Sequence, residues 1–363
     1  MKVLFLVSHL SGGGAERTVA YLSGYLARNG VDTCVLSVSD KKFYELDERV
    51  KYASLHIANE EKNIVDRWFK AVRRTVLINR FIAREQPDVV FCMLYRMAKY
   101  LTLTKNRSYK LIVSERNNPA VVKAKKDVDL RRRIFSACNG IVFQTLRAQN
   151  YFPEEFRRKG AVIPNAVGNE QVYRISPVSD RAQKICAVGR LCRQKNYPLL
   201  IRAFKRVLKK HPAYVLEIYG NGPDLPALTE LAGSLGISDR VRFCGMNPNV
   251  VQKIADAACY VLCSLYEGMP NALMEAMAAG VPCVAVDCPN GPAELIVDGE
   301  NGILIPCGEE DALVGAILKM IEDKQFAERC GLRAREILRT HGLETNAQQY
   351  LEFINDVVRE NRT

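Results

Sequence analysis

The stretch SLYEGMPNALMEAMAAGVPCVAVD, residues 264–287, decides the fold. It follows the apolar run YVLCS, it has Pro270 where a helix begins, and Gly280 followed by Val-Pro predicts where that helix ends. A strand, a helix and a second strand in this order are typical of a parallel sheet covered by helices. The stretch also carries two acids, Glu267 before the helix and Glu275 within it.

The same alternation of short β-branched runs and amphipathic segments extends through the chain, which predicts two doubly wound α/β units in tandem. The first helix is expected to begin at Ala15, with Val19, Leu22 and Leu26 on its buried face. Strands of the first half are expected near Val3–Val7, Thr33–Val38, Val89–Met93, Leu111–Ser114, Ile141–Gln144 and Ala161–Ile163.

A chain of 363 residues is too long for one ordinary core, so two domains are expected. Between residues 165 and 184 the periodic pattern stops, and glycine and proline occur instead, which predicts a linker. The expected domains are residues 1–166 and 167–344. The helical tail begins at Glu309, and residues 345–363 are predicted to pack back on the first domain.

Positive charge is concentrated in the first half of the chain. Residues 1–165 contain 30 Lys and Arg against 16 Asp and Glu, whereas the remainder contains 22 against 24. The pattern of a nucleic-acid module is missing, so we expect no nucleic acid and an anionic membrane surface as the partner. No apolar run is long enough to span a bilayer, and the first apolar run is interpreted as a strand. The expected location is therefore cytoplasmic, peripheral to the inner membrane.

The cysteines indicate neither a disulfide framework nor a zinc site. Six of the twelve lie in apolar runs typical of buried strands, and there is no C-x-x-C. The pair Asp127 and Asp129 forms a D-x-D, but it lies in the basic helical segment KKDVDLRRR. We interpret these two acids as surface neutralisers, and no metal or other cofactor is expected.

The start of the helix in residues 264–287 predicts an anion site. Gly268 permits close backbone approach, and the N–H groups of Met269, Asn271 and Ala272 lie at the helix N-terminus. The acids before and within the helix would bind hydroxyl groups on either side of a phosphate. A nucleotide sugar has this chemistry.

Two other loops follow strands. In AVGRLCRQKNYPLL, Gly189 ends a strand, and Arg190 and Lys195 precede a helix, where they would hold a diphosphate. In SHLSGGGAER, residues 8–17, three glycines precede the first helix, which predicts close approach by a substrate or by the other domain. Arg17 stands where a nicotinamide fingerprint has its third glycine.

The motifs GGGAER, VGRLCRQKN, EIYGNGP, VRFCG and EGMPNALMEAMAAGVPCV resemble family 4 of the retaining glycosyltransferases over nearly the whole chain. This resemblance implies the GT-B fold, with two Rossmann-like domains facing a central cleft. It implies that Arg190 and Lys195 hold the donor diphosphate, that Glu267 faces the donor sugar and that Glu275 binds ribose. The full donor-binding set that it implies is Gly13, Gly14, Gly189, Arg190, Lys195, Gly220, Phe243, Gly245, Glu267, Gly268, Met269, Pro270, Asn271, Ala272 and Glu275.

Many family members have a histidine in the acceptor domain where this chain reads Glu115-Arg116-Asn117. Arg116 is the replacement that we expect to donate a hydrogen bond to the transferring sugar, although arginine stays protonated and cannot act as a base. Together with Glu267, Arg190 and Lys195 it completes the expected catalytic set.

The expected activity is metal-independent transfer, with retention, of a hexose or N-acetylhexosamine from a nucleotide-diphosphate sugar, a UDP-sugar in our interpretation. The acceptor would be a membrane-embedded glycolipid. ERNNP and DCPNGPAEL resemble members that build bacterial polysaccharide, lipopolysaccharide or capsule on polyprenyl diphosphate. Two alternatives stay open: a nucleotide-sugar 2-epimerase with the same two domains, and a non-catalytic nucleotide-sugar-binding scaffold. Glu267 by itself could also serve only to stabilise a helix start.

The segment RWFKAVRRTVLINRFIAR, residues 67–84, has bulky apolar residues at helical spacing among five arginines and Lys70. It suits an interfacial membrane helix. The default for a doubly wound unit is that the apolar residues pack on the sheet and leave the arginines in solvent. Both interpretations can hold together, with a basic outer face over an apolar inner one. The residues that this default buries are Phe69, Val72, Val76 and Phe81.

Overall fold

The computed structural model describes the chain except for residues 12, 58–62, 102–106, 169–172, 174–179 and 360–363. The chain divides into two compact units, one of residues 1–166 with 343–363 and the other of residues 167–342. Half of the linker predicted at 165–184 lies outside the described residues, and so does Gly12 of the glycine loop.

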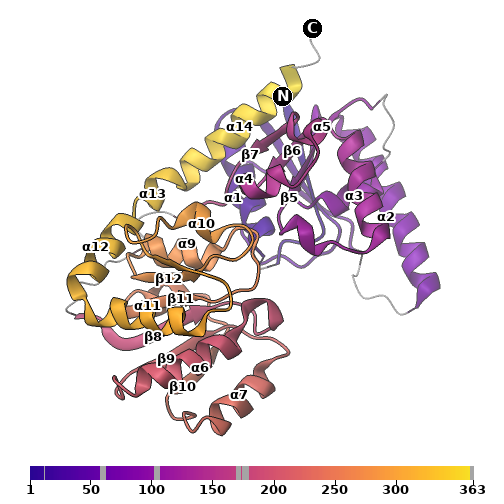
Figure 1. The fold of residues 1–363 in the computed structure, drawn as a ribbon. Helices are drawn as coiled ribbons and strands as arrows, with labels where there is room; N and C mark the ends of the chain where they lie inside the picture. The colour runs from indigo at the N-terminus through magenta and orange to yellow at the C-terminus, as the bar shows by residue number, and fades with distance from the viewer. Residues whose placement is uncertain (12, 58–62, 102–106, 169–172, 174–179, 360–363) are drawn as a thin grey trace. The chain divides into compact units, whose positions relative to one another are not determined.

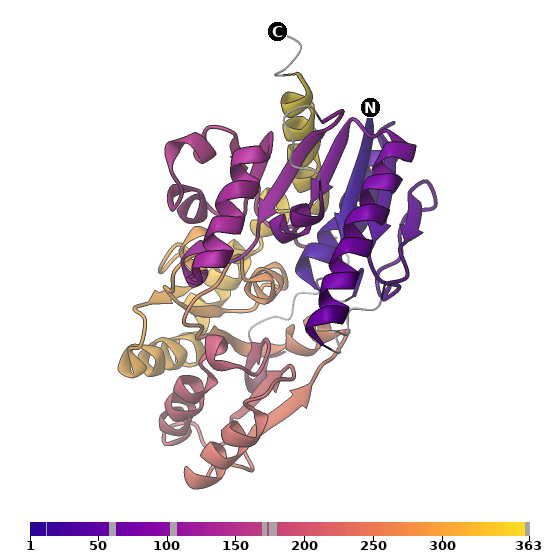
Figure 2. The ribbon, with the colours of Figure 1, turned by 90° about the vertical axis from the view of Figure 1, so that its right-hand side faces the viewer.

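The first unit is a seven-stranded parallel sheet in the order β3-β2-β1-β4-β5-β6-β7 (Figures 1 and 2). Its strands are β1 (Lys2–Val7), β2 (Asp32–Ser37), β3 (Lys51–Ser54), β4 (Val89–Cys92), β5 (Lys110–Glu115), β6 (Gly140–Phe143) and β7 (Gly160–Val162). Its helices are α1 (Gly14–Arg28), α2 (Ile64–Glu85), η1 (Tyr95–Tyr100), η2 (Pro119–Val121), α3 (Lys125–Ala137), α4 (Leu146–Asn150), α5 (Glu154–Arg157) and α14 (Leu343–Arg359).

Helices cover both faces of this sheet, which explains why its central strands are apolar without alternation. On one face α1 and α14 pack in a core that includes Val19, Leu22, Tyr350 and Ile354. On the other face α2 and α3 pack in a second core that includes Phe135. The tail therefore returns to the first unit, two residues earlier than the predicted start at residue 345.

Two expectations for the first unit were wrong. Sequence reasoning missed β3, whose sequence KYAS has no β-branched run and which lies at the edge of the sheet. The default packing of α2 was wrong for three of its four residues, because only Phe81 is buried. The exposed fractions of Phe69, Val72 and Val76 are 66%, 43% and 43%. The buried face of α2 is formed instead by Ile78, Phe81 and Ile82.

The second unit is a six-stranded parallel sheet in the order β10-β9-β8-β11-β12-β13. Its strands are β8 (Ala182–Val188), β9 (Val215–Tyr219), β10 (Val241–Gly245), β11 (Ala257–Leu262), β12 (Cys283–Val286) and β13 (Ile303–Ile305). Its helices are η5 (Arg193–Lys195), α6 (Tyr197–Leu208), α7 (Leu225–Ser234), α8 (Val250–Ile254), α9 (Asn271–Ala278), α10 (Pro292–Leu295), α11 (Glu310–Glu322), α12 (Lys324–Ala334) and α13 (Ile337–Thr340).

This sheet too has a core on each face, one against α6 and α11 and the other against α9. The six cysteines predicted in buried strands are all buried, and they are Cys34, Cys92, Cys186, Cys259, Cys263 and Cys283. In the described parts of the chain, no helix is long and apolar enough to cross a membrane.

Candidate active site

The strand order of the second unit reverses between β8 and β11, which pair with each other in the middle of the sheet. In doubly wound sheets ligands bind beyond the carboxyl ends of the strands at such a reversal. The loop after β8 contains Gly189, Arg190 and Lys195, and the loop after β11 contains Glu267. The topology therefore brings the two predicted motifs to one edge of one sheet.

Gly189 allows the loop after β8 to fold back on itself. Its φ is +158°, and a Cβ placed there would lie 2.7 Å from Lys195 Cε and 3.0 Å from Tyr197 Oη. A side chain at this position would displace the lysine side chain, so glycine lets Lys195 lie close over the loop. Arg190, the next residue, is exposed. The loop thus exposes Arg190 to solvent and holds Lys195 close to the backbone of Gly189.

Glu267 is the centre of a buried polar cluster. Its exposed fraction is 5%, and its Oε1 accepts hydrogen bonds from Lys195 Nζ at 2.6 Å and from Ser264 Oγ at 2.5 Å. The two loops are also joined by Gln194 Nε2, which donates to the Tyr266 carbonyl at 2.9 Å. A buried charge pair of this kind is costly to break, because the remaining charge has no partner. The cluster therefore fixes where the cation and the acid lie.

The helix that follows, α9, begins one residue later than the motif predicts. Pro270 is its N-cap residue and Asn271 its first residue. The backbone before it is crowded, since a Cβ on Gly291 would lie 2.6 Å from the Gly268 carbonyl oxygen and 2.6 Å from Pro270 Cδ. The first turn of a helix presents N–H groups that the helix itself does not use, and these attract anions. Glu275 lies on α9 and is half-buried.

Gly220 and Gly245 complete this edge of the sheet. Gly189 N donates to the Tyr219 carbonyl at 2.9 Å, and Gly220 N donates to the Gly245 carbonyl at 2.8 Å. The φ of Gly220 is +140°, and a Cβ there would lie 2.0 Å from the Gly189 carbonyl oxygen. The backbones after β8, β9 and β10 thus approach one another at glycines, and Phe243 lies in β10 beside them.

The structure places the expected residues of the second unit in the strand ends and loops of this single edge and in α9, which begins there. It adds two residues that sequence reasoning missed, Ser264 and Gln194. Both were within reach of the sequence, because Ser264 precedes Glu267 by three residues and Gln194 adjoins Lys195. Their hydrogen bonds, however, depend on how the two loops meet.

The glycine loop of the first unit is approached by its own helix. Gly13 is the N-cap residue of α1, which starts at Gly14. A Cβ on Gly13 would lie 2.1 Å from Glu16 Oε2, and Glu16 is buried. His9 Nδ1 lies 2.7 Å from Ser11 Oγ and 3.7 Å from Glu16 Oε1. The space beside Gly13 is therefore occupied by the acid that begins α1.

Arg116 lies directly after β5 and is buried. Its Nη2 donates to Thr18 Oγ1 at 3.1 Å and to Asn165 Oδ1, while Nη1 is 3.0 Å from Met93 Sδ and 3.4 Å from Tyr350 Oη. These partners come from α1, from the ends of two strand segments and from α14. The guanidinium therefore joins the parts of the first unit, including its returning C-terminal helix.

A pocket of about 530 Å³ opens beyond β4 and β5 of this unit. Ser114 and Glu115 line it, with exposed fractions of 0% and 2%. Among the described residues Ser114 Oγ has no hydrogen-bond partner. Glu115 Oε2 accepts from Arg131 Nη1 at 3.3 Å. Burial raises the pKa of the Glu115 carboxyl to about 7, and Arg131 offsets part of that rise. Sequence reasoning missed both residues.

The D-x-D acids lie at the start of α3 beside this pocket. Asp127 is 3.6 Å from Arg96 Nη2, and Asp129 is exposed. Within the described ranges, no group of three or more His, Cys, Asp or Glu side chains is arranged to hold a metal ion. Asp127 is thus paired with a cation of its own unit.

Comparison with known proteins matches two family models in succession. The model described as Glycosyltransferase Family 4 matches residues 12–171, and the model described as Glycosyl transferases group 1 matches residues 170–337. Among solved structures, sucrose-phosphate synthase from Thermosynechococcus elongatus is similar with a TM-score of 0.84 and 17% identity, covering 99% of this chain and 100% of that one. At this identity the likeness concerns the fold, which is GT-B.

Two relatives with assigned activities are similar over almost all of this chain. The exopolysaccharide phosphotransferase SCO2592 of Streptomyces coelicolor is 27% identical over 99% of this chain, which spans only 41% of that protein. The GalNAc-alpha-(1->4)-GalNAc-alpha-(1->3)-diNAcBac-PP-undecaprenol alpha-1,4-N-acetyl-D-galactosaminyltransferase of Campylobacter jejuni is 25% identical, covering 98% of this chain and 99% of its own. Because the two family models together extend from residue 12 to residue 337, the chain belongs to glycosyltransferase family 4.

Proposed function

We propose that this chain transfers a hexose or N-acetylhexosamine, with retention, from a UDP-sugar to a polyprenyl-diphosphate-linked glycolipid. The single observation that carries the proposal is the pair of the part-buried Lys195 and the buried Glu267 at the strand reversal of the second unit, 2.6 Å apart beside the start of α9. The Campylobacter relative, which by its name acts on an undecaprenol-linked saccharide, supports the class of acceptor. The product would belong to a surface polysaccharide, lipopolysaccharide, capsule or protein-linked glycan.

In this proposal the donor lies along the edge of the sheet at Gly189, Gly220 and Gly245. The diphosphate contacts Arg190, Lys195 and the N–H groups at the start of α9, the ribose hydroxyls contact Glu275, and Glu267 faces the donor sugar. When the bond to the diphosphate breaks, negative charge grows on the leaving oxygen, where two cations and a helix N-terminus stabilise it. Such stabilisation needs no metal.

The proposed reaction proceeds at the face of the sugar from which the diphosphate leaves. The acceptor hydroxyl oxygen bonds to the anomeric carbon, the bond from that carbon to the diphosphate oxygen breaks, and the hydroxyl proton passes to the leaving diphosphate. Glu267 orients the sugar, because its carboxylate is already held by Lys195 and Ser264. No second carboxylate is needed as a nucleophile.

We propose that the acceptor binds in the pocket beside β5 of the first unit. Ser114 Oγ, buried and with no hydrogen-bond partner among the described residues, would bind an acceptor hydroxyl there. Arg96 and Lys123 also line the pocket and suit an anionic group of the acceptor. Arg116 also lines this pocket, but four protein groups already contact its guanidinium, so in this proposal it has a positioning role.

Product analysis tests the proposal. The purified protein is incubated with UDP-N-acetylgalactosamine, UDP-N-acetylglucosamine or UDP-glucose, with and without polyprenyl-diphosphate-linked saccharide, in the presence of excess chelator. We expect a lengthened saccharide with an α-linked sugar from one donor. Conversion of the UDP-sugar into its 2-epimer without acceptor would indicate an epimerase. Donor binding with neither product would indicate a scaffold, and a requirement for magnesium would contradict the metal-independent step.

A further inference from the structure

Helix α2 of the first unit has two apolar faces. Its inner face, with Ile78, Phe81 and Ile82, is buried in the core under the sheet. Its outer face carries five large apolar side chains whose exposed fractions lie between 43% and 66%. They are Val65, Trp68, Phe69, Val72 and Val76. Because their spacing is three or four residues, they form one stripe on the opposite side of the helix from the buried residues.

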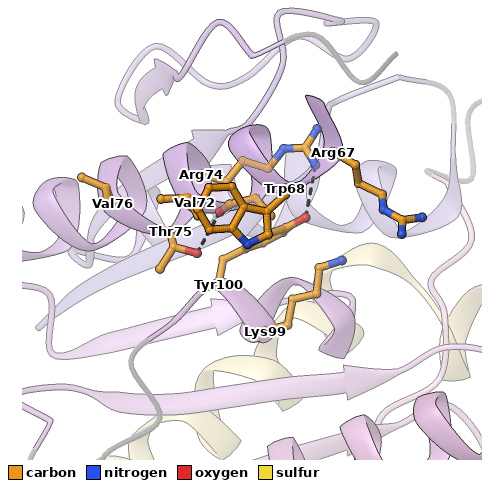
Figure 3. A pocket seen from close by; sticks show the side chains of 9 residues that line it. Arg67, Trp68, Val72, Arg74, Thr75, Val76, Lys99 and Tyr100 are labelled. Atoms are coloured by element: carbon orange, nitrogen blue, oxygen red, sulfur yellow. Dashed lines mark hydrogen bonds between the residues drawn. The ribbon is translucent and has the colours of Figure 1, made fainter. Parts of the chain in front are cut away.

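A groove of about 620 Å³ runs beside this stripe, between α2 and η1. Figure 3 shows Trp68, Val72 and Val76 extending from α2, with Tyr100 and Lys99 on η1. Arg74 Nη1 donates to Tyr100 Oη at 3.2 Å and so fixes the floor of the groove. The surface therefore combines an apolar stripe with a groove that has cationic side chains at its margins, Arg67 and Lys99.

Positive charge follows the stripe along the helix. Arg73, Arg80 and Arg84 are exposed, and helical spacing places all three along one flank of the stripe. Of these three arginines, Arg84 is offset by Glu85 at 3.1 Å, an acid that is also buried against Lys2 and Lys51. The other acid of α2, Asp66, is paired with Lys70 at 2.8 Å. An aromatic and aliphatic stripe bordered by arginines is complementary to a surface of anionic headgroups over hydrocarbon.

We propose that the outer face of α2 docks on an anionic phospholipid bilayer, with the helix lying in the plane of the interface. Trp68 and Phe69 would enter the boundary between headgroups and acyl chains, and the flanking arginines would contact lipid phosphates. Each arginine near such a surface strengthens binding about fivefold. The proposal rests on the proposed function, since it names the surface by which the enzyme reaches a membrane-embedded acceptor.

Trp68 makes the test direct because it is the chain's single tryptophan. Its emission is recorded as phosphatidylcholine vesicles containing phosphatidylglycerol are added, and flotation measures the bound fraction. We expect a blue shift and binding that weakens as salt rises. Vesicles of phosphatidylcholine alone should bind at least about tenfold less, because the arginine contacts are lost. Unchanged Trp68 emission while the protein stays unbound at low salt would overturn the proposal.

Substitutions separate docking from folding and from catalysis. The double variant Phe69→Ser with Val72→Ser should lower binding at least about tenfold, by loss of buried apolar area. Arg73→Gln with Arg80→Gln should lower it to a similar extent only on anionic vesicles. The controls are Leu332→Ser, an exposed apolar residue of α12, and Arg206→Gln, an exposed cation of α6. Circular dichroism and thermal unfolding confirm that the variants are folded.

A water-soluble acceptor with a short lipid distinguishes failure of this proposal from failure of the proposed function. The docking variants should transfer sugar to it at the wild-type rate and lose transfer only to acceptor in vesicles. If the wild-type protein binds vesicles but transfers to no acceptor, docking stands and the function is wrong. Vesicle binding by Phe69→Ser with Val72→Ser that equals the wild type would overturn docking through α2, whatever the activity.

Discussion

Each unit contains a buried serine and a buried glutamate at the carboxyl end of a parallel strand. In the second unit, Ser264 Oγ donates to Glu267 Oε1 at 2.5 Å and Lys195 completes the cluster at 2.6 Å. In the first unit, Glu115 has Arg131 at 3.3 Å, but Ser114 Oγ has no partner among the described residues. One cluster is complete within the protein, whereas the other has unused hydrogen-bonding capacity.

The two clusters differ in whether their hydrogen bonds are complete before a ligand binds. A buried hydroxyl without a partner costs about 1–3 kcal/mol, and a ligand that supplies the partner recovers that free energy. The complete cluster gains nothing of this kind, but it holds its cation and acid in position in advance. We therefore interpret the second unit as a preorganised donor site and the first as a site that its acceptor completes.

The largest expected effect comes from breaking the complete cluster. Lys195→Ala removes a cation that stabilises the leaving diphosphate and leaves Glu267 with its charge uncompensated, so kcat should fall about 10²–10³-fold. Glu267→Gln keeps the size of the side chain and should lower kcat to a similar extent. Steady-state transfer assays measure both. Arg206→Ala, an exposed cation paired with Asp311, is the control, and a matching loss there would remove the assignment.

Because the backbones approach closely at the donor edge, replacing a glycine there should lower the free energy of unfolding. Gly220→Ala combines a positive φ with a Cβ 2.0 Å from the Gly189 carbonyl oxygen, so we expect a loss of about 3 kcal/mol or more in the free energy of unfolding. Gly315→Ala in α11 has open space around its Cβ and should gain about 0.5–1 kcal/mol. Urea unfolding checks both. Equal stability of the two variants would show that the edge is loosely packed.

Glu115 should make the free energy of unfolding depend on pH. Its pKa is raised to about 7 in the folded chain from an ordinary value of 4.5, so the folded protein holds a proton that the unfolded chain has lost. The free energy of unfolding should therefore fall as pH rises from 4.5 to 7, by up to about 3 kcal/mol at about 1.4 kcal/mol per pH unit. Glu115→Gln should abolish this slope when unfolding is measured across that range. An unchanged slope would assign it to other groups.

The smallest expected changes in stability are those of the two serine variants, and they distinguish the two clusters. Ser264→Ala should lose about 1–2 kcal/mol, because it removes a hydrogen bond from a buried carboxylate. Ser114→Ala should leave the stability of the free protein unchanged or increase it by about 1 kcal/mol, since it deletes an unpartnered hydroxyl. It should nevertheless raise KM for the acceptor and not for the donor. Loss of stability in Ser114→Ala, with unaltered KM, would break the comparison.

Sequence predicted the donor edge because its signals are local. Glycine, proline and charge within a few residues of a strand end indicate a loop that can bind a ligand, and the topology of parallel sheets then brings such loops together. The motif at residues 264–287 predicted the start of its helix to within one residue. Pro270 is the N-cap residue and does not lie in the first turn.

Features that depend on packing could not be predicted in the same way. The apolar residues of α2 occupy two opposite faces, so helical periodicity alone does not say which face the sheet buries. In ERNNP, sequence reasoning selected Arg116 on chemical grounds, yet the orientation of its side chain is set by neighbours from α1 and α14. That Ser114 Oγ has no hydrogen-bond partner among the described residues depends on every group packed around it.

Binding of the donor to the second unit tests the central claim most directly. Isothermal titration with UDP, and then with the preferred UDP-sugar, compares the wild type with Lys195→Ala, Glu275→Ala and Arg206→Ala. We predict that the first two variants bind at least about tenfold more weakly, a loss of about 1.4 kcal/mol each, and that Arg206→Ala binds as the wild type does. Equal affinity of all four proteins would contradict a nucleotide site built on the Lys195–Glu267 cluster and α9.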